Sequence, residues 1–460
     1  MGGSLKVQSG SYDPTMRCFL KSHWRTSCRP LRGLCEYFRA YDPGVPLRST
    51  PGFTLAPAPR AGAESAQAIS TTQLFGVILI VAVASGALCQ AAAQSLSFEV
   101  ARVDRARVLK AANRYLSEKP VTITAAQSPR SAGGLHDFFS EGDYWWPDPS
   151  NPGGAYLQRD GMTNPDNFVE HRRYLMRLSV QVPALVAAWK LTRDARYAKH
   201  AVRHLRAWFV DAATRMNPNL QYAQAIHGRF TGRGIGIIDT IHLVEVARAI
   251  EVLHDGKVIS RSDFAGVRQW FADYLAWMTT SKNGLDEREA KNNHGTCWVM
   301  QVAAFAKLTG NQELLDYCRN RFKTVLVPNQ IAADGSFPEE LRRTKPYGYS
   351  LFNLDALTTV AQILSTRDDN LWTFTLPDGR GIGRAMEYMA PYIKDKKRWP
   401  LKPDAMYDAE WPMRHTSLFF AGLAYGKVEY IALWKTLKAD SNVEEVVRNF
   451  FIRQPVLWTN

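Results

Sequence analysis

Apolar residues recur at every third or fourth position along most of the chain after residue 170, which is the pattern of amphipathic α-helices. Almost no segment there alternates apolar and polar residues with the period of two that a half-buried strand shows. The pattern predicts helices over residues 171–192, 194–213, 236–254, 262–281, 294–309, 311–326, 351–365, 381–393 and 413–437. The expected fold class is therefore all-α.

These helices are expected to pair into hairpins. Residues 171–192 and 194–213 are separated only by Arg193, and Asp194 is a suitable N-cap for the second helix. The segments AAWKLTRDARYAKHA and AAFAKLTGNQELLDYC each end one helix at a Leu-Thr turn and begin the next. Repeated helical hairpins are typical of an α/α toroid or a solenoid.

The first hundred residues have a different character. Residues 74–88 form an uncharged apolar run that is too short to span a membrane and is followed by the small residues AAAQS, so residues 73–94 are predicted to be a signal peptide. An uncleaved membrane anchor is the alternative. Residues 1–72 are rich in Arg, Pro, Ser and Gly, which predicts an unstructured or wrongly included extension. We expect a mature catalytic domain over residues 95–460, secreted or periplasmic, without stable membrane association after cleavage.

A long segment between residues 134 and 167 lacks any period and is crowded with Pro, Gly, Asn and aromatic residues. Loops of this length are usually functional or disordered. Because it contains Tyr144, Trp145 and Trp146, we expect it to form the lid or rim of a cleft.

The formal net charge of +14 indicates a polyanionic partner, which is nucleic acid, an anionic membrane or an acidic polysaccharide. No nucleic-acid-binding motif is present, so nucleic acid is not expected. The 13 Trp and 18 Tyr suit a sugar-binding cleft, although most of them belong to the core. Cys297 and Cys318 could pair, but the sequence does not show it.

Asn292, Asn293 and His294 stand at the predicted start of helix 294–309. The positive end of a helix dipole favours anions, so this is a candidate binding or catalytic site. An Asn cap beside a structural His would give the same pattern.

Residues 335–350, GSFPEELRRTKPYGYS, place the cations Arg342, Arg343 and Lys345 beside the phenols Tyr347 and Tyr349. The functional interpretation is a cationic loop that serves a reactive phenol. A solvated basic turn is the simpler alternative.

Residues 217–239 contain His227, Arg233 and the sequence GRGIGIID. No strand precedes its glycines and their spacing is not that of a dinucleotide-binding fingerprint, so no such cofactor is expected. His200 and His204 are four residues apart, but neighbouring Lys and Arg residues favour a solvated cationic face over a metal site. No metal or other cofactor is predicted. His415 follows AEWPMR and could line the cleft.

The segments YAQAIHGRFTGRGIGIIDT, KNNHGTCW and ELRRTKPYGYS, in this order and separated by helices, resemble the alginate lyase superfamily. The resemblance covers roughly residues 143–425. It implies a single large domain built as an incomplete (α/α) toroid or barrel of helical hairpins. It also implies cleavage of a uronate-containing anionic polysaccharide by β-elimination, without a cofactor, to give 4,5-unsaturated ends.

In such lyases an Asn-His pair on one helix, with an Arg and a Tyr on a later loop, surrounds the uronate that is cleaved. The resemblance assigns the pair to Asn293 and His294. It assigns the Arg and Tyr to Arg342 and Tyr349, which keep the familiar spacing of seven residues. This chain has Arg-Arg-Thr-Lys and Ser-Leu where Arg-Gly-x-Arg and His-Asn are usual, so Tyr347 stays an alternative to Tyr349. The expected substrate contacts are Asn292, Tyr347, Lys345, Arg343, His227, Arg233, Tyr144, Trp145, Trp146 and His415.

The chemistry agrees with these residue types. Removing the C5 proton of a uronate places charge on a carboxylate that is already negative, and Asn293, Arg342 and His294 can neutralise it. A phenol with an ordinary pKa near 10 becomes a usable base if nearby cations lower that pKa. Tyr349 can serve as both base and acid when the C5 proton and O4 lie on one face. When they lie on opposite faces, His294 is the better base and Tyr349 the acid.

Several alternatives stay open at this point. Alginate is the first expected substrate, and glucuronan or another glucuronate polymer is the second. A glycoside hydrolase on the same toroid would need two carboxylates, of which Glu339, Glu340 or Asp334 could supply one. A non-catalytic protein that binds acidic glycans would share the basic, aromatic cleft without needing Tyr349. The oligomeric state is not predicted.

Overall fold

The computed structural model describes residues 99–459, which lie within one compact unit of the chain. The predicted extension over residues 1–72 and the predicted signal peptide over residues 73–94 lie outside the described residues. Among the described helices, none is long and apolar enough to cross a bilayer.

The first predicted hairpin is present as α2 and α3 (Glu170–Thr192 and Ala195–Phe209). Arg193 ends α2 in the left-handed conformation, with φ of 61°. Asp194 then caps α3 by accepting a hydrogen bond from the backbone N–H of Arg196. The reversal between the two helices therefore takes only two residues.

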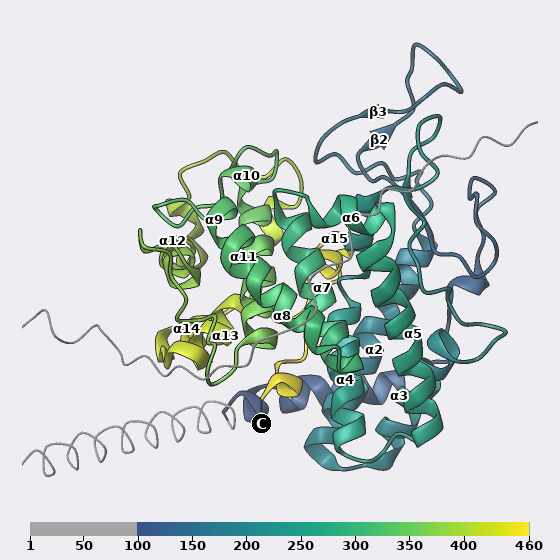
Figure 1. The fold of residues 1–460 in the computed structure, drawn as a ribbon, viewed down its shortest axis with the longest axis horizontal. Helices are drawn as coiled ribbons and strands as arrows, with labels where there is room; N and C mark the ends of the chain where they lie inside the picture. Colours follow the sequence, from purple (N-terminus) through teal and green to yellow (C-terminus); the bar gives the residue numbers. More distant parts are fainter. Residues whose placement is uncertain (1–98, 460) are drawn as a thin grey trace, which may run out of the picture. The chain divides into compact units, whose positions relative to one another are not determined.

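Five helices form an inner layer in which each packs against the next along the chain (Figure 1). Nearly all residues of α7 and α11 are buried, so these helices carry apolar residues on every side instead of a single stripe. The inner helices are α2, α4 (Leu243–Asp255), α7 (Asn293–Thr309), α11 (Pro346–Leu364) and α13 (Thr416–Tyr425).

The helices that alternate with these along the chain pack on the outside of the inner layer. They are α3, α5 (Arg261–Thr280), α8 (Gln312–Arg321), α12 (Ile382–Lys394) and α14 (Val428–Thr436). The result is an incomplete all-α toroid of helical hairpins, as the sequence predicted.

Some predicted boundaries were wrong. The predicted helix 413–437 is two helices, α13 and α14, because Gly426 adopts a left-handed φ of 64° that ends α13. The predicted helix 236–254 begins as the 3₁₀ segment η2 (Gly234–Thr240), and α4 starts only at Leu243. The predicted helix 311–326 leaves α geometry after Arg321 and continues as the π turn η3 (Phe322–Leu326).

Other elements were not predicted. They include a helix over residues 99–115, the short helices α6 (Lys282–Arg288), α9 (Val327–Gln330), α10 (Pro338–Leu341) and α15 (Glu444–Asn449), and the 3₁₀ turns η1 (Ile123–Ala125), η4 (Lys396–Arg398), η5 (Asp408–Glu410) and η6 (Pro455–Trp458). Most of these are too short to show a helical period. Two of them, α6 and α15, carry residues of the site described below.

The segments that precede α2 and α4 form two small sheets. Strand β1 (Phe139–Glu141) runs parallel to β4 (Tyr222–Ala225), and β2 (Trp145–Trp146) pairs antiparallel with β3 (Leu157–Gln158). The β2–β3 hairpin belongs to the segment that was expected to be a lid or rim, and it stands beyond the helix ends at the top of Figure 1.

Candidate active site

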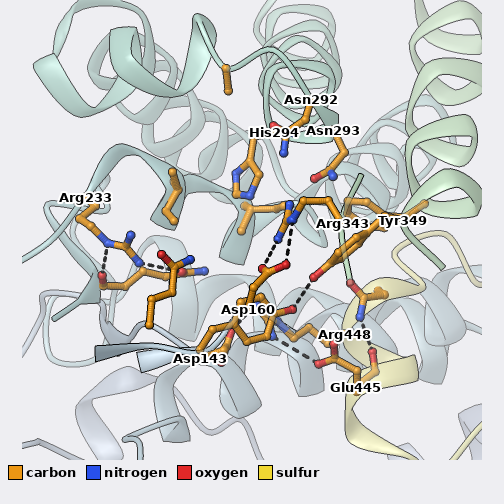
Figure 2. Close-up of a pocket in the computed structure, with 18 of the residues that line it drawn as sticks. Asp143, Asp160, Arg233, Asn292, Asn293, His294, Arg343, Tyr349, Glu445 and Arg448 are labelled. Atoms are coloured by element: carbon orange, nitrogen blue, oxygen red, sulfur yellow. Dashed lines mark hydrogen bonds and ion pairs between the residues drawn. The ribbon is translucent and has the colours of Figure 1, made fainter. Parts of the chain in front are cut away.

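A cavity of about 390 Å³ opens between the β2–β3 hairpin, the first residues of α7 and α11, and helix α15 (Figure 2). Eight of the residues predicted from sequence line it, namely Tyr144, Trp145, Arg233, Asn292, Asn293, His294, Arg343 and Tyr349. Residues distant in sequence are therefore brought to one place, as the predicted site requires.

The start of α7 fixes the amide of Asn293. The Asn292 side chain caps the helix by accepting the N–H of His294 at 3.3 Å. The backbone N–H and Nδ2 of Asn293 both donate to the carboxylate of Glu340, each at 2.7 Å. Glu340 is fully buried, and that burial raises its pKa. One carboxylate therefore sets the orientation of Asn293, and Glu340 itself does not line the cavity.

His294 is oriented by a carboxylate from α6. Its Nδ1 lies 2.7 Å from Oε1 of Glu287, a buried residue. A carboxylate accepts hydrogen bonds, so Nδ1 is the donor, and in the neutral form of the ring Nε2 carries the lone pair. The ring projects into the cavity in Figure 2, where Nε2 can accept a proton.

Tyr349 reaches the cavity from the first turns of α11. Its hydroxyl lies 2.7 Å from that of Tyr144, and the guanidinium of Arg343 lies 4.6 Å from the centre of its ring. Burial raises the pKa of Tyr349, although Arg343 and Tyr144 act to lower it. The nearby cation therefore does not lower the pKa of this phenol overall, which was the condition for a readily usable base.

Arg343, not Arg342, is the arginine of this loop that enters the cavity. Arg343 pairs with Asp160, which follows β3, with Nη2 2.7 Å from Oδ1. Arg342 is largely exposed and pairs with Glu339 outside the cavity. Both residues follow the end of α10, where the chain turns, and this turn directs the two neighbouring side chains to different places. The arginine that was assigned to the site by spacing alone, Arg342, therefore lies outside the cavity.

Tyr347 is likewise outside the cavity. It is fully buried, donates its hydroxyl hydrogen to the carbonyl of Tyr392 at 3.1 Å, and packs edge-on against Trp399. Tyr349 is two positions further along the helix and therefore faces a different side. Tyr347 is a core residue, so of these two tyrosines only Tyr349 belongs to the site.

Four other predicted contacts also lie outside the cavity lining. Lys345 is buried against Glu445 at 3.2 Å. His415 is buried with Nδ1 2.8 Å from Asp355. His227 is exposed and contacts the carbonyl of Gly153 at 3.2 Å. Trp146 is half-buried in β2 and donates to the carbonyl of Met162 at 2.9 Å.

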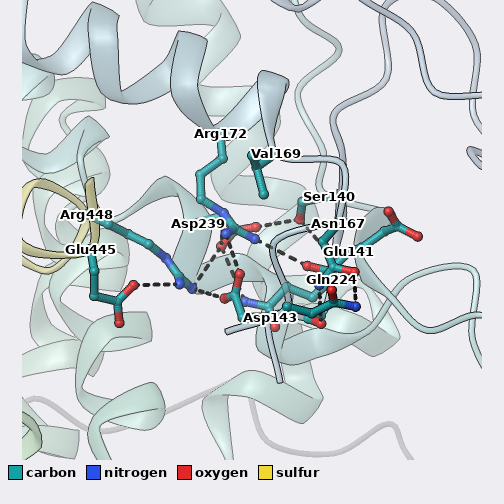
Figure 3. Close-up of polar contacts among 12 residues, drawn as sticks. Ser140, Glu141, Asp143, Asn167, Val169, Arg172, Gln224, Asp239, Glu445 and Arg448 are labelled. Carbon is teal, nitrogen blue, oxygen red and sulfur yellow. Dashed lines mark hydrogen bonds and ion pairs between the residues drawn. The ribbon is translucent and has the colours of Figure 1, made fainter. Parts of the chain in front are cut away.

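A buried ionic network forms the floor beside Tyr144 (Figure 3). Asp143 lies 2.6 Å from Arg172 of α2 and 2.5 Å from Arg448 of α15, and both guanidinium groups also approach Asp239. Burial alone would raise the pKa of Asp143, but the two arginines hold it below its ordinary value. Glu445 completes the network at 3.4 Å from Arg448.

Sequence reasoning missed Asp160, Glu287, Arg448 and the positioning role of Glu340. Glu287 left no usable signal, because it lies on α6 and His294 lies on α7, so their separation along the chain is not a spacing along one helix. Arg448 left none, since it stands far beyond the motifs and makes its contacts only after folding.

Within residues 99–459, no group of three or more His, Cys, Asp or Glu residues could hold a metal ion. His200 and His204 are buried, with their Nε2 atoms 3.3 Å apart, so the expected solvated face was wrong. Burial lowers the pKa of His204 to about 4. Cys297 and Cys318 are both free and buried.

Residues 122–399 match the family model described as alginate lyase. A solved alginate lyase from Bacteroides ovatus is 30% identical, with 79% of this chain and 97% of that chain covered and a TM-score of 0.67. A histidine variant of alginate lyase A1-III complexed with a tetrasaccharide is 16% identical, with 75% and 89% covered and a TM-score of 0.51, and shares the fold. No match was found among the curated proteins.

The network at Asp143 generates a stability prediction. Asp143→Asn should lower the free energy of unfolding by about 3–5 kcal/mol at pH 7, because Arg172 and Arg448 lose a buried countercharge. Since the folded-state pKa of Asp143 is lowered, its contribution is present above its unfolded pKa and is lost as the pH falls through the folded value. Urea unfolding of both proteins should therefore show a difference that shrinks below about pH 4.

Asp286→Asn is the matched control, because Asp286 forms an exposed pair with Lys282 and should contribute at most about 1 kcal/mol. If Asp143→Asn lowers the free energy of unfolding by no more than Asp286→Asn does, the network does not stabilise the fold.

Proposed function

Because the chain belongs to the alginate lyase family and is a polysaccharide lyase, we propose that it cleaves a 1,4-linked polyuronate, with alginate as the first choice, by β-elimination. The observation that carries the proposal is the convergence of an amide, an imidazole, a guanidinium and a phenol in one cavity. These are Asn293, His294, Arg343 and Tyr349, and together they supply what the elimination of a uronate requires.

Neutralising the uronate carboxylate is the first requirement. Arg343 can form a charge-assisted pair with it, and Asn293 has a second N–H on Nδ2 beside the one that Glu340 holds. As the C5 proton leaves, negative charge spreads onto this carboxylate, so fixed donors stabilise the transition state more than the ground state. Glu340 and Asp160 hold the two donors in place before the substrate arrives.

Two proton transfers complete the reaction. The base takes the C5 proton, the electron pair forms the C4–C5 double bond, and the C4–O4 bond breaks as O4 receives a proton. In mannuronate and glucuronate the C5 proton and O4 lie on one face, so Tyr349 can take the first proton and return it. In guluronate they lie on opposite faces, so Nε2 of His294 takes the proton and the Tyr349 hydroxyl gives one.

Glucuronan is the second candidate substrate, because glucuronate has the same arrangement at C4 and C5 as mannuronate. The predicted signal peptide at residues 73–94 supports a proposed location outside the cell or in the periplasm, where such polymers are accessible. The purified protein should be incubated with polymannuronate, polyguluronate and glucuronan while the ultraviolet absorbance of the unsaturated uronate is followed. No increase with any of the three polymers would refute the proposed substrate class.

Replacing the phenol tests its role directly. Tyr349→Phe should lower kcat by at least about 100-fold on every polymer that the enzyme cleaves, because the proton to O4 is lost. His294→Gln should reduce cleavage of polyguluronate far more than cleavage of polymannuronate. Tyr347→Phe is the matched control, which should retain activity and lose only about 1 kcal/mol of stability with its hydrogen bond to Tyr392. If Tyr347→Phe and Tyr349→Phe lower kcat equally, the assignment of Tyr349 as the catalytic phenol is contradicted.

The two neighbouring arginines form a second matched pair. Arg343→Gln should lower kcat/KM roughly 100-fold to 1,000-fold, as expected when a donor to a developing charge is removed. Arg342→Gln should stay close to the wild-type rate, because its guanidinium is exposed and pairs with Glu339. If Arg342→Gln lowers kcat/KM more than Arg343→Gln does, Arg342 is the arginine that binds the substrate carboxylate.

The pH dependence should differ between substrates. Burial raises the pKa of Tyr349, so the phenol is protonated near neutral pH and only its small ionised fraction can act as a base. On polymannuronate, kcat/KM should therefore rise roughly tenfold per unit between about pH 7 and 9. On polyguluronate the protonated phenol is the reactive form, and no such rise is expected. If kcat/KM rises equally with pH on both polymers, the proposal that Tyr349 is the base for mannuronate and His294 the base for guluronate is contradicted.

A further inference from the structure

Arg233 is a cation of the cavity wall that forms no ion pair within the described residues. Its Nε donates to the backbone carbonyl of Gln224 at 2.9 Å, and its Nη2 approaches Oε1 of the same residue at 3.4 Å. Both acceptors are neutral. In Figure 2, Arg233 lies on the far side of His294 from Tyr349 and Arg343.

The carboxylates near Arg233 are engaged elsewhere. Asp143 and Asp239 are shared between Arg172 and Arg448, and Glu287 faces the imidazole of His294. These acids act on Arg233 only through space. The positive charge of Arg233 is therefore not cancelled by a direct partner, in contrast to Arg343 with Asp160.

The surrounding backbone is adapted to this guanidinium. Gln224 adopts a left-handed φ of 50°, a conformation that costs a non-glycine residue free energy, and its carbonyl holds Nε of Arg233. At Gly142, a Cβ atom would lie 2.9 Å from Nη2 of Arg233 and 2.8 Å from Cδ1 of Trp145. A strained residue and a glycine thus keep Arg233 in a fixed place beside Trp145.

Burial lowers the pKa of Arg233 to about 10, so it is still a cation at neutral pH. A guanidinium that has lost water and has no anionic partner gains more from binding a carboxylate than a solvated one does. Because the cavity is open to Arg233, a ligand can supply that carboxylate.

We propose that Arg233 binds the carboxylate of the uronate next to the one that is cleaved, so that the enzyme requires two consecutive uronates. The inference rests on the proposed function. Arg343 then neutralises the reacting sugar, and Arg233 recognises its neighbour. The preferred substrates are contiguous polyuronates, and polymers in which uronates alternate with neutral sugars are poor substrates.

Polymers with a graded loss of charge test this inference. The best polyuronate substrate is reduced at random with carbodiimide and borohydride, which converts part of its carboxyl groups to alcohols. If two carboxylates are needed, the initial wild-type rate at low substrate concentration follows the square of the remaining carboxyl fraction. With half of the carboxyls left, the rate should fall to about one quarter for the wild type and about one half for Arg233→Gln.

On the intact polymer, Arg233→Gln should lower kcat/KM roughly tenfold to 100-fold, mainly through KM, because the lost contact binds substrate and transition state alike. Arg229→Gln is the matched control. The Arg229 guanidinium also lies over the ring of Trp145, at 5.3 Å, but Arg229 is absent from the cavity lining and should keep the wild-type rate and the square dependence.

If the wild-type rate is proportional to the remaining carboxyl fraction itself and not to its square, the inference is overturned, and no variant is needed to show this. If the rate of Arg233→Gln still follows the square of the carboxyl fraction, two carboxylates are needed but Arg233 is not the residue that binds the second one. If the wild type forms no unsaturated product from any intact polyuronate, the proposed function fails, which is a different result from measurable cleavage with the wrong dependence.

Discussion

The buried contact of Asp143 with two arginines is the constraint on which the site depends. Arg172 comes from α2 and Arg448 from α15, so three distant parts of the chain meet at one carboxylate. In a region without water, such charges are tolerated only together. Because Tyr144 directly follows Asp143, the same contact fixes the phenol that lies 2.7 Å from the hydroxyl of Tyr349. The stability of the fold and the geometry of the site therefore have a common origin.

The cavity is not simply a basic surface, although the chain has a net charge of +14. Its acidic residues Asp143, Asp160 and Glu445 are each paired with an arginine or lysine. Most of the excess charge therefore lies elsewhere, where it can attract a polyanion at long range. Recognition inside the cavity depends instead on where each donor is held, and carboxylates such as Glu340 and Glu287 hold those donors.

The sequence predicted the hairpin architecture, because hairpins such as α2 and α3 have a clear helical period and an evident cap at Asp194. It also predicted that Asn293, His294 and Tyr349 belong to one site, which the structure brings together in the cavity. It could not separate Arg343 from Arg342, because both follow the end of α10, where the direction of each side chain depends on the folded turn. Nor could it anticipate the net effect on the pKa of Tyr349, because desolvation is a property of the folded surroundings.

Helix α15 has a consequence for the order in which the molecule matures. A nascent chain that has been synthesised only through α14 already contains Asp143, Asp239 and Arg172, but lacks the second guanidinium that balances the two carboxylates. The toroid can form its hairpins as they emerge, whereas the charged floor beside Tyr144 is completed only when residues 444–449 dock. The charged network beside Tyr144 thus depends on a helix near the end of the chain, although Asp143, Arg172 and Asp239 come from much earlier in the sequence.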